Sequence, residues 1–384
     1  MSKVCMISTG HSPFDDRIFH KEAKSLEKAG YDVAVICQSD NDFSTILDNI
    51  KVEGIKRRGS GFIGELFQMG KLFLRSLNLN YDIYHCHEPQ SLIVGLFLRF
   101  LCRKKIIYDV HEHWPSQISS RYGGLRKKII TNIVEKIEHK SRAYVSYFIV
   151  APPNLKDRFS KDNIKNNVDI LYVCPELGIF SHINDAIVRE FIGRNTIVYE
   201  GNIDVKYRGL DVFVKSLPIL AKQYPNLLYL IVGRMLISSA EMESLNQYLV
   251  EYEVRDHFTY TDWVEYADVP SYLSASKLGV ILLQPVSYNN IIGTPNKLFD
   301  YMAAGIPVVA SDFPNIRSIV EDAKCGILVD PTDPQDIADS IAYLLNNPEI
   351  AISMGQNGKK AIESKYNWEN MEQRLYRIYH EVSG

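Results

Sequence analysis

The sequence lacks the marks of an exported or membrane-spanning protein. Its six cysteines form no C-x-x-C pair, and several stand in apolar runs, where a free thiol behaves as a small apolar side chain. The longest apolar stretch, Ser91–Cys102, is broken by Arg99 and is shorter than the roughly 20 residues that a spanning helix needs. The first residues have neither the charged start nor the long apolar core of a signal peptide. We therefore expect a cytoplasmic chain.

Net charge is small, −3 over 384 residues, but it is unevenly distributed. Residues 1–174 hold 26 Lys and Arg against 19 Asp and Glu, a net +7, whereas the remainder holds 17 against 27, a net −10. From Leu125, apolar residues recur at helical spacing with basic residues on other faces, as in a core-facing helix or a helix that lies on a membrane. The basic half is a candidate for peripheral contact with the anionic inner face of the plasma membrane. We expect no nucleic acid partner.

Short β-branched runs alternate with helical periods along the chain, which is typical of parallel sheets covered by helices. The runs that we expect to form strands are Val4–Ser8, Val33–Cys37, Ile83–Cys86, Ile106–Asp109 and Phe148–Val150, then Ile197–Glu200, Leu228–Val232, Val280–Leu283, Val308–Ala310 and Ile327–Val329. They predict an α/β protein with two Rossmann-like domains, residues 1–174 and 175–366, with a linker near residues 173–195. Ligands bind beyond the carboxyl ends of such strands, so two facing domains would form a cleft there.

The most informative segment is residues 291–312, IIGTPNKLFDYMAAGIPVVASD. Thr294 can cap a helix that opens on a proline, and Gly305 can close that helix before the next strand. The free amides at the start of this helix favour a diphosphate, and Lys297 adds positive charge. Asp300 stands one turn further on and can accept hydrogen bonds from a ribose diol.

This segment resembles the signature of the family-4 glycosyltransferases, retaining enzymes of GT-B fold. In that family two acids are separated by seven intervening residues, and the second acid holds the nucleotide ribose. Asp300 matches the second acid, whereas Ile292 stands at the position of the first. The chain is similar to a branch with P-x-K-L-x-E-Y-M-A-x-G, which also lacks the first acid.

A second landmark of the family, G-R-x5-K-G, supplies two cations for the diphosphate. Here Arg208 matches the lysine, Asn202 replaces the arginine, and Lys206 is a candidate for the second charge. The ends of later strands resemble those that line the nucleotide-base pocket. The resemblance therefore implies a donor site built from Gly201, Lys206, Arg208, Gly233, Val264, Gly293, Thr294, Lys297 and Asp300.

After its first predicted strand the first domain carries Asp15-Asp-Arg-Ile-Phe-His-Lys-Glu-Ala, which resembles the opening of the same branch. Arg17 and Asp16 are candidates for contact with the donor phosphate or the acceptor, and a salt bridge from Arg17 to Asp16 or Glu22 is the alternative.

A third landmark is Tyr108-Asp-Val-His-Glu-His-Trp-Pro at a strand end. His111 aligns with the family histidine beside the reacting sugar, and Asp109 and Glu112 can orient or polarise it. We expect these three residues to be catalytic.

Two H-x-H pairs at neighbouring strand ends give an alternative from another class. With the acids beside them they resemble the ligands of a metallohydrolase, the residues being His85, His87, Glu88, His111, Glu112 and His113. The sequence has no H-E-x-x-H helix, and this hypothesis leaves the signature of the second domain unexplained.

The resemblance extends over the whole chain, including the last helix within residues 367–384, which in the family crosses back to the first domain. It implies a retaining, metal-independent glycosyltransferase of the hexosyltransferase type, with no metal and no cofactor. A UDP- or GDP-sugar would donate to a glycan or lipid-linked glycan in bacterial surface polysaccharide (capsule or O-antigen) biosynthesis. A GT-B sugar-nucleotide epimerase or hydrolase, and a catalytically inactive relative, stay open as alternatives.

Overall fold

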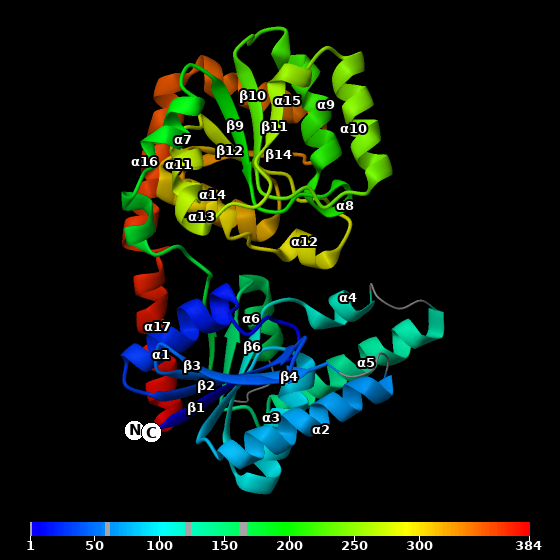
Figure 1. Cartoon of the computed structure of the whole chain (residues 1–384), viewed down its shortest axis with the longest axis vertical. Helices are drawn as coiled ribbons and strands as arrows, with labels where there is room; N and C mark the ends of the chain where they lie inside the picture. The colour runs from blue at the N-terminus through cyan, green and yellow to red at the C-terminus, as the bar shows by residue number, and fades with distance from the viewer. Residues whose placement is uncertain (1, 58–61, 120–123, 161–166) are drawn as a thin grey trace. The chain divides into compact units, whose positions relative to one another are not determined.

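A computed structural model describes residues 2–57, 62–119, 124–160 and 167–384 of the chain (Figure 1). The chain forms two compact units. Unit 1 comprises Met1–Val173 together with Asn370–Gly384, and unit 2 comprises Cys174–Glu369. The last helix thus begins in unit 2, and most of its length belongs to unit 1.

Unit 1 is built on an eight-stranded sheet of order β3-β4-β2-β1-β5-β6-β7-β8, in which only the β3–β4 pairing is antiparallel. Its strands are β1 (Lys3–Ser8), β2 (Asp32–Ser39), β3 (Phe43–Leu47), β4 (Ile50–Lys56), β5 (Ile83–Cys86), β6 (Lys105–Val110), β7 (Tyr147–Val150) and β8 (Val168–Ile170). The helical segments are η1 (Asp16–Ala23), α1 (Lys24–Lys28), α2 (Phe62–Leu79), α3 (Pro89–Cys102), α4 (Trp114–Ser119), α5 (Gly124–Ser141), η2 (Pro153–Leu155), α6 (Lys156–Ser160) and α17 (Trp368–Ser383).

Unit 2 is built on a six-stranded parallel sheet of order β11-β10-β9-β12-β13-β14. Its strands are β9 (Asn195–Glu200), β10 (Leu227–Val232), β11 (Phe258–Tyr260), β12 (Leu278–Ile281), β13 (Val308–Ser311) and β14 (Gly326–Val329). The helical segments are η3 (Leu177–Ser181), α7 (Asp185–Glu190), α8 (Val205–Arg208), α9 (Leu210–Ala221), α10 (Ser239–Glu251), η4 (Arg255–His257), η5 (Tyr266–Asp268), α11 (Val269–Ser274), α12 (Tyr288–Ile292), α13 (Lys297–Ala304), α14 (Pro314–Ala323), α15 (Pro334–Asn346) and α16 (Pro348–Ser364).

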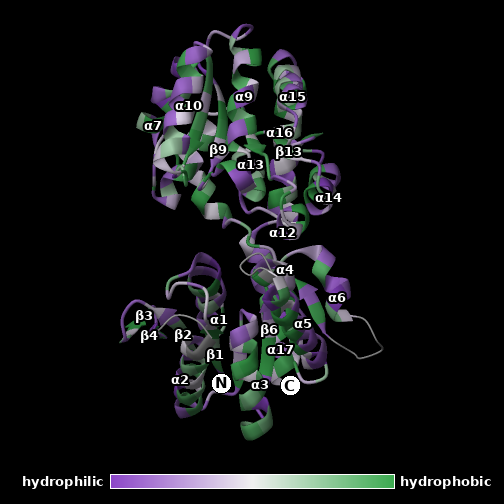
Figure 2. Ribbon diagram, turned by 90° about the vertical axis from the view of Figure 1, so that its right-hand side faces the viewer, coloured by the Kyte–Doolittle hydropathy of each residue, from purple (hydrophilic) through white to green (hydrophobic). Residues whose placement is uncertain are grey.

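All ten strands expected from the sequence are present, and the two parallel sheets confirm the predicted α/β class. These strands carry mostly apolar residues, because both faces of a parallel sheet are covered by helices (Figure 2). Four strands were missed. β3 is an exposed edge strand joined to β4 by Asp48 and Asn49, whose positive φ angles make a hairpin turn. β8 and β11 have three residues each, too few to show a period.

The segment expected to be a linker, residues 173–195, has more structure than the sequence indicates. It contains η3 and α7, and Asn184 caps α7 by accepting a hydrogen bond from the amide of Ala186. α7 also packs against α11, so most of this segment is part of unit 2. Apart from Cys174, Pro175 and Phe191, its apolar residues are exposed or only half-buried, and this explains why the sequence shows no clear period there.

Candidate functional site

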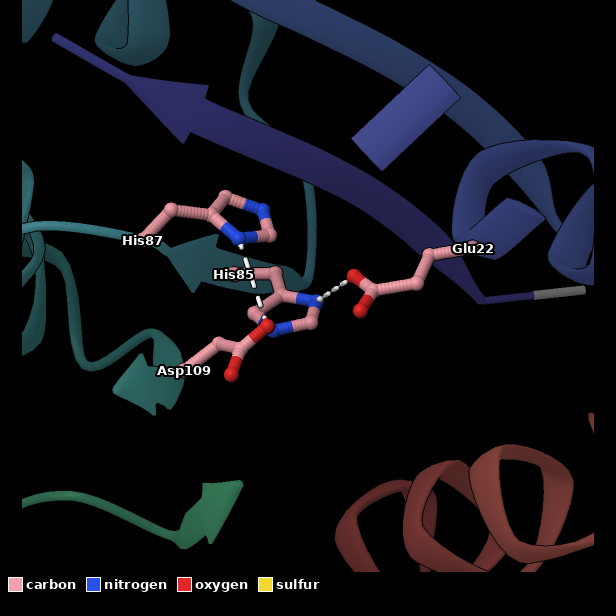
Figure 3. Close-up of side chains that lie close together, drawn as sticks. All are labelled: Glu22, His85, His87 and Asp109. Atoms are coloured by element: carbon pink, nitrogen blue, oxygen red, sulfur yellow. Dashed lines mark ion pairs between the residues drawn. The ribbon is translucent and has the colours of Figure 1, made fainter. Parts of the chain in front are cut away.

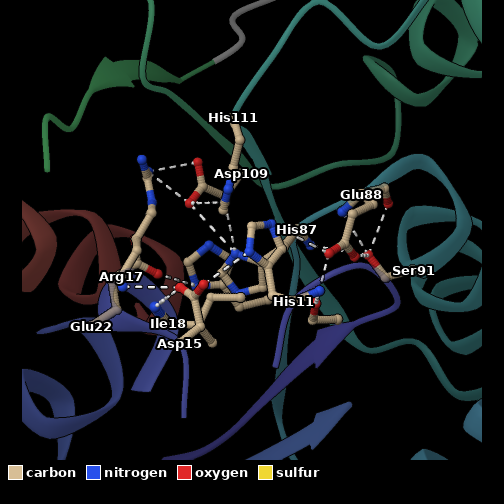
Figure 4. Close-up of polar contacts among 12 residues, drawn as sticks. His11, Asp15, Arg17, Ile18, Glu22, His87, Glu88, Ser91, Asp109 and His111 are labelled. Atoms are coloured by element: carbon tan, nitrogen blue, oxygen red, sulfur yellow. Dashed lines mark hydrogen bonds and ion pairs between the residues drawn. The ribbon is translucent and has the colours of Figure 1, made fainter. Parts of the chain in front are cut away.

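The predicted catalytic residues lie at one edge of the unit 1 sheet. β1 pairs with β5 and β5 with β6, all in parallel, so the carboxyl ends of these strands lie side by side. The loop after β1, the residues after β5 and the end of β6 therefore converge at this edge (Figure 4). The site is assembled from segments far apart in the sequence.

Asp109 is at the centre of this group and is fully buried. Its carboxylate accepts a hydrogen bond from Nη2 of Arg17 at 2.8 Å and one from Nε2 of His111 at 3.1 Å. Nδ1 of His87 lies 3.5 Å from it. Burial alone would raise the pKa of Asp109, but the charge of Arg17 and the contact with His111 hold this pKa well below its usual value. Asp109 is therefore an anion that fixes the His111 ring.

The structure places Arg17 inside unit 1 rather than at its surface. Its guanidinium pairs with Glu22 at 2.8 Å and with Asp109 at 2.7 Å, and the side chain is only 7% exposed. Of the two salt bridges considered from the sequence, the one to Glu22 is formed. Asp16 instead pairs with Lys21 and is exposed. To contact a phosphate, the Arg17 guanidinium would have to break its ion pairs with the buried carboxylates of Glu22 and Asp109.

Two histidines from β5 and its end lie beside Glu22 and Asp109, with one candidate ligand atom from each of the four within 4.8 Å of the others (Figure 3). The rings of His85 and His87 stack at a centroid distance of 4.4 Å, and Nδ1 of His85 is already engaged by the Tyr379 hydroxyl at 2.9 Å. Arg17 already supplies a positive charge between the carboxylates. The cluster thus fits an internal ion-pair network better than a metal centre.

Of the remaining members of the H-x-H pairs, His111 contacts His87 at 3.2 Å, whereas His113 lies apart from this cluster. Nδ1 of His113 contacts Ser116 at 2.7 Å and its Nε2 lies 3.2 Å from Arg158, on the side of α4 and α6. Glu112 is partly buried in the loop between β6 and α4. The structure therefore brings together His85, His87 and His111, but not His113.

Sequence reasoning missed the role of the loop after β1. This loop surrounds the carboxylate of Glu88, which accepts hydrogen bonds from Ser8 Oγ at 2.6 Å and from the amides of Thr9 and Gly10 at 2.8 and 3.0 Å (Figure 4). The ring of His11, in the same loop, lies 4.8 Å from that of His111 between centroids. The sequence does hold a signal for this loop, namely the run of small residues with hydrogen-bond donors after the first strand, because loops of this kind bind anions.

The predicted donor residues of unit 2 gather at the carboxyl ends of β9 and β10. Lys297 is 7% exposed, and its ammonium donates to the carbonyl of Glu200 and lies 4.0 Å from the ring centroid of Tyr199. Gly201 has φ +92° and Gly233 has φ +145°. A Cβ on Gly233 would lie 2.4 Å from the Gly201 carbonyl oxygen, so this close approach requires glycine at 233, and the positive φ angle favours glycine at 201.

Asp300 and Thr294 flank the start of α13. Asp300 is buried and accepts a hydrogen bond from the Tyr266 hydroxyl at 2.7 Å. The predicted Thr294 cap is wrong. Pro295 and the next residue form the opening turn, and Thr294 Oγ1 is buried without a hydrogen-bond partner. Gly305 closes the helix with φ +74°, as expected.

The two basic residues of the second landmark lie on the short helix α8. Arg208 pairs with Asp204 at 3.5 Å and is 41% exposed, so its guanidinium is accessible to a ligand. Lys206 is exposed and lies over the ring of Tyr207. Burial raises the pKa of Glu200, against the charges of Lys297 and Arg208, and its Oε2 has no hydrogen-bond partner.

The two other predicted donor residues are in loops. Gly293 follows α12 directly, and Val264 lies between β11 and η5, partly buried. The predicted donor residues thus come from five segments of unit 2: the residues after β9, β10 and β11, the helix α8, and the segment from the end of α12 into α13.

Two family models match the chain. Glycosyl transferases group 1 matches residues 183–361, and Glycosyltransferase Family 4 matches residues 17–172. A 2-deoxystreptamine N-acetyl-D-glucosaminyltransferase of Niallia circulans is 22% identical over 324 residues, 80% of this chain and 79% of the relative. A phosphatidyl-myo-inositol mannosyltransferase of Mycobacterium leprae is 22% identical over 308 residues, 79% of this chain and 74% of the relative.

Solved structures share the fold over the whole chain. A sucrose-phosphate synthase from Thermosynechococcus elongatus superposes with a TM-score of 0.78 at 17% identity, covering 100% of this chain and 99% of the other. HepE of Anabaena in complex with UDP-glucose gives 0.74 at 14% identity, covering 99% and 100%.

Proposed function

The chain belongs to the family-4 glycosyltransferases of GT-B fold, and we propose that it is a retaining, metal-independent hexosyltransferase that uses a nucleotide-sugar donor. The observation that carries this proposal is the geometry at the ends of β9 and β10, where a buried lysine lies beside two close-packed glycines. Small residues let a diphosphate approach the backbone, and the lysine supplies positive charge.

In this proposal the leaving diphosphate is stabilised by fixed charges. Lys297, the accessible Arg208 and the first amides of α13 would take up the negative charge that develops as the glycosidic bond breaks. Asp300, oriented by Tyr266, would accept from the ribose hydroxyls. The unpartnered oxygens of Glu200 and Thr294 are further polar groups available to a donor. A relative solved with UDP-glucose supports a uridine nucleotide as the first candidate.

His111 is proposed to contact the reacting sugar, with Asp109 holding its ring. Since Nε2 of His111 donates to Asp109, the proton sits on Nε2 and Nδ1 is left as a hydrogen-bond acceptor. Glu112, in the same loop, remains a candidate for polarising this ring or binding the acceptor. A sugar-nucleotide epimerase or hydrolase would need the same donor site, so transfer to a supplied glycan distinguishes the two activities.

A thermal-shift experiment tests the donor site. With EDTA present, we expect one of UDP-, GDP-, ADP- or TDP-sugars to raise the melting temperature, and the Asp300→Ala variant to lose that rise because it loses the ribose contact. Asp339→Ala, an exposed carboxylate on α15, should retain it. A melting temperature that responds to added zinc, but to none of the nucleotides, would contradict the proposal and favour the histidine cluster as a metal site.

The acceptor is proposed to be a glycan or lipid-linked glycan of surface polysaccharide synthesis, and α5 supports membrane contact. Its side chains Leu125, Ile129 and Ile133 are 73%, 50% and 50% exposed, and Lys136 and Lys140 continue the same stripe at helical spacing. Within the described residues no helix has the length and apolarity that crossing a membrane requires. An exposed apolar stripe that runs into lysines suits the surface of an anionic bilayer.

Co-sedimentation with phosphatidylglycerol vesicles tests this contact. We expect Ile129→Ser together with Ile133→Ser to reduce the bound fraction by about tenfold, because burying two isoleucines stabilises the bound state by roughly 1.5 kcal/mol or more. The matched control is Ile350→Ser with Ile352→Ser, which are exposed on α16 in unit 2. If both pairs of substitutions have the same effect, or if the protein binds neutral vesicles equally well, α5 is not the contact.

A further inference from the structure

The loop between β1 and η1 brings a second imidazole next to His111. The rings of His11 and His111 have centroids 4.8 Å apart and are tilted by 53° (Figure 4). The His11 side chain is 28% exposed, whereas that of His111 is 12% exposed and His85 and His87 are fully buried. His11 is thus the most accessible histidine of the group.

Two carboxylates hold the His11 ring in place. Nδ1 lies 3.0 Å from Asp15, whose other oxygen caps η1 by accepting from the amides of Arg17 and Ile18 at 2.9 and 3.1 Å. Nε2 lies 3.7 Å from Glu88, which is fixed by the loop amides described above. A carboxylate only accepts, so Nδ1–H of His11 donates to Asp15, and Nε2 carries a hydrogen only in the imidazolium form, which the two neighbouring carboxylates favour. In that form Nε2–H can donate to a ligand, because its 3.7 Å distance from Glu88 exceeds hydrogen-bond distance.

The environments of the two imidazoles favour different protonation states. Burial lowers the pKa of His11, but the hydrogen bond to Asp15 and the charge of Glu88 outweigh it, so the pKa is raised. Burial lowers the pKa of His111 to about 4, despite the charge of Asp109. Two neighbouring groups whose pKa values are shifted in opposite directions are typical of a proton donor paired with a proton acceptor. The other charged group facing this pair is Arg17, which is neutralised by its own carboxylates.

We propose that His11 is a second sugar-contacting residue, and that its Nε2–H donates to the same hydroxyl oxygen of the transferred sugar whose proton His111 Nδ1 accepts. Among the described residues, the hydrogen bonds of the His111 ring involve Nε2, which leaves Nδ1 for the ligand. The two rings are neighbours, with centroids 4.8 Å apart, so both can reach one ligand group. This inference rests on the proposed glycosyltransferase function and deepens it, since it assigns a hydroxyl-recognition role.

Donor hydrolysis by the full chain tests the inference without an acceptor. The probes are UDP-glucose and GDP-mannose, each beside analogues that lack one sugar hydroxyl at a time, and the readout is kcat/KM for nucleotide release. For one analogue we expect wild type to lose about 10- to 100-fold, the effect of leaving a site donor and acceptor unpaired. In His11→Leu, kcat/KM for the parent donor should fall by a similar factor, and that analogue should be hydrolysed as fast as the parent.

His20→Leu, an exposed histidine of η1, is the matched control and should behave as wild type. His11→Gln retains a donating N–H and should restore part of the discrimination. Equal losses on the parent and on every analogue in His11→Leu would mean a structural role and would overturn the inference. Wild type that hydrolyses neither parent donor would instead contradict the proposed function.

Discussion

Replacing Lys297 by Met is expected to lower kcat/KM for glycosyl transfer by about a thousandfold while the protein stays folded. The ammonium is buried against the Glu200 carbonyl and the Tyr199 ring, close to the two glycines of the donor site. Removing one preorganised charged group that stabilises a leaving group in a water-excluded site typically costs 10²–10³-fold or somewhat more. Met has a similar length, so the loss reflects charge more than volume.

The same substitution has a second consequence for Glu200. Burial raises the pKa of this carboxyl and the charge of Lys297 opposes that effect, so without the lysine the pKa of Glu200 rises further. Lys297→Arg should not rescue activity. The ammonium is buried against the Glu200 carbonyl and the Tyr199 ring, and the larger planar guanidinium cannot take the same position there.

Steady-state transfer kinetics and urea unfolding together check this prediction. Lys277→Met is the matched control, because this lysine is exposed at the amino end of β12, at the opposite edge of the sheet. If Lys297→Met keeps kcat/KM within about threefold of wild type, the lysine does not bind the diphosphate and the proposed donor site is wrong.

Sequence reasoning predicts well the structural elements that are determined by residues close together in the sequence. The ten expected strands are apolar runs because each is covered on both faces, and Gly305 ends α13 because only a left-handed residue fits there. The alignment of Lys297 and Asp300 with the family signature likewise depends on one continuous segment. These features are encoded within about twenty residues of one another.

The unit 1 network could not be predicted in the same way, because its partners are distant in the sequence. Arg17 and Asp109 are 92 positions apart, and Ser8 and Glu88 are 80 apart. Their contacts depend on the strand order β1-β5-β6, which places three loops at one edge. The motif after the first strand identifies Arg17 as a candidate functional residue. Only the sheet topology shows that its guanidinium pairs with Asp109 instead of facing solvent.

Thr294 illustrates a local prediction that fails. A threonine followed by a proline is a common start for a helix, yet here the opening turn uses the carbonyl of Pro295 and leaves the hydroxyl unpaired. A buried hydroxyl without a partner destabilises the unliganded protein. In the proposed function that cost is recovered when a donor oxygen or phosphate occupies the site.

Lowering the pH from 7 to 4 is expected to destabilise the protein by about 3 kcal/mol through His111 alone. In the folded chain burial lowers the pKa of this imidazole to about 4, whereas the ordinary value is 6.5. Between these values the unfolded chain binds the proton and the folded chain does not, so the free energy of unfolding falls as the pH drops through this window. Burial lowers the pKa of His85 as well, which adds to the effect, whereas the raised pKa of His11 opposes it.

Urea unfolding measured at intervals from pH 7 to pH 4 checks this expectation. His111→Gln should flatten the curve, since the substituted side chain takes up no proton in either state. His182→Gln, an exposed histidine before α7, should leave the slope unchanged. His11→Gln should steepen it, because the raised pKa of His11 stabilises the folded chain at low pH and that stabilisation is lost as the pH rises through its folded value. Equal slopes for wild type and His111→Gln would show that His111 is not held neutral by burial, and would remove the basis for its role as a hydrogen-bond acceptor toward the sugar.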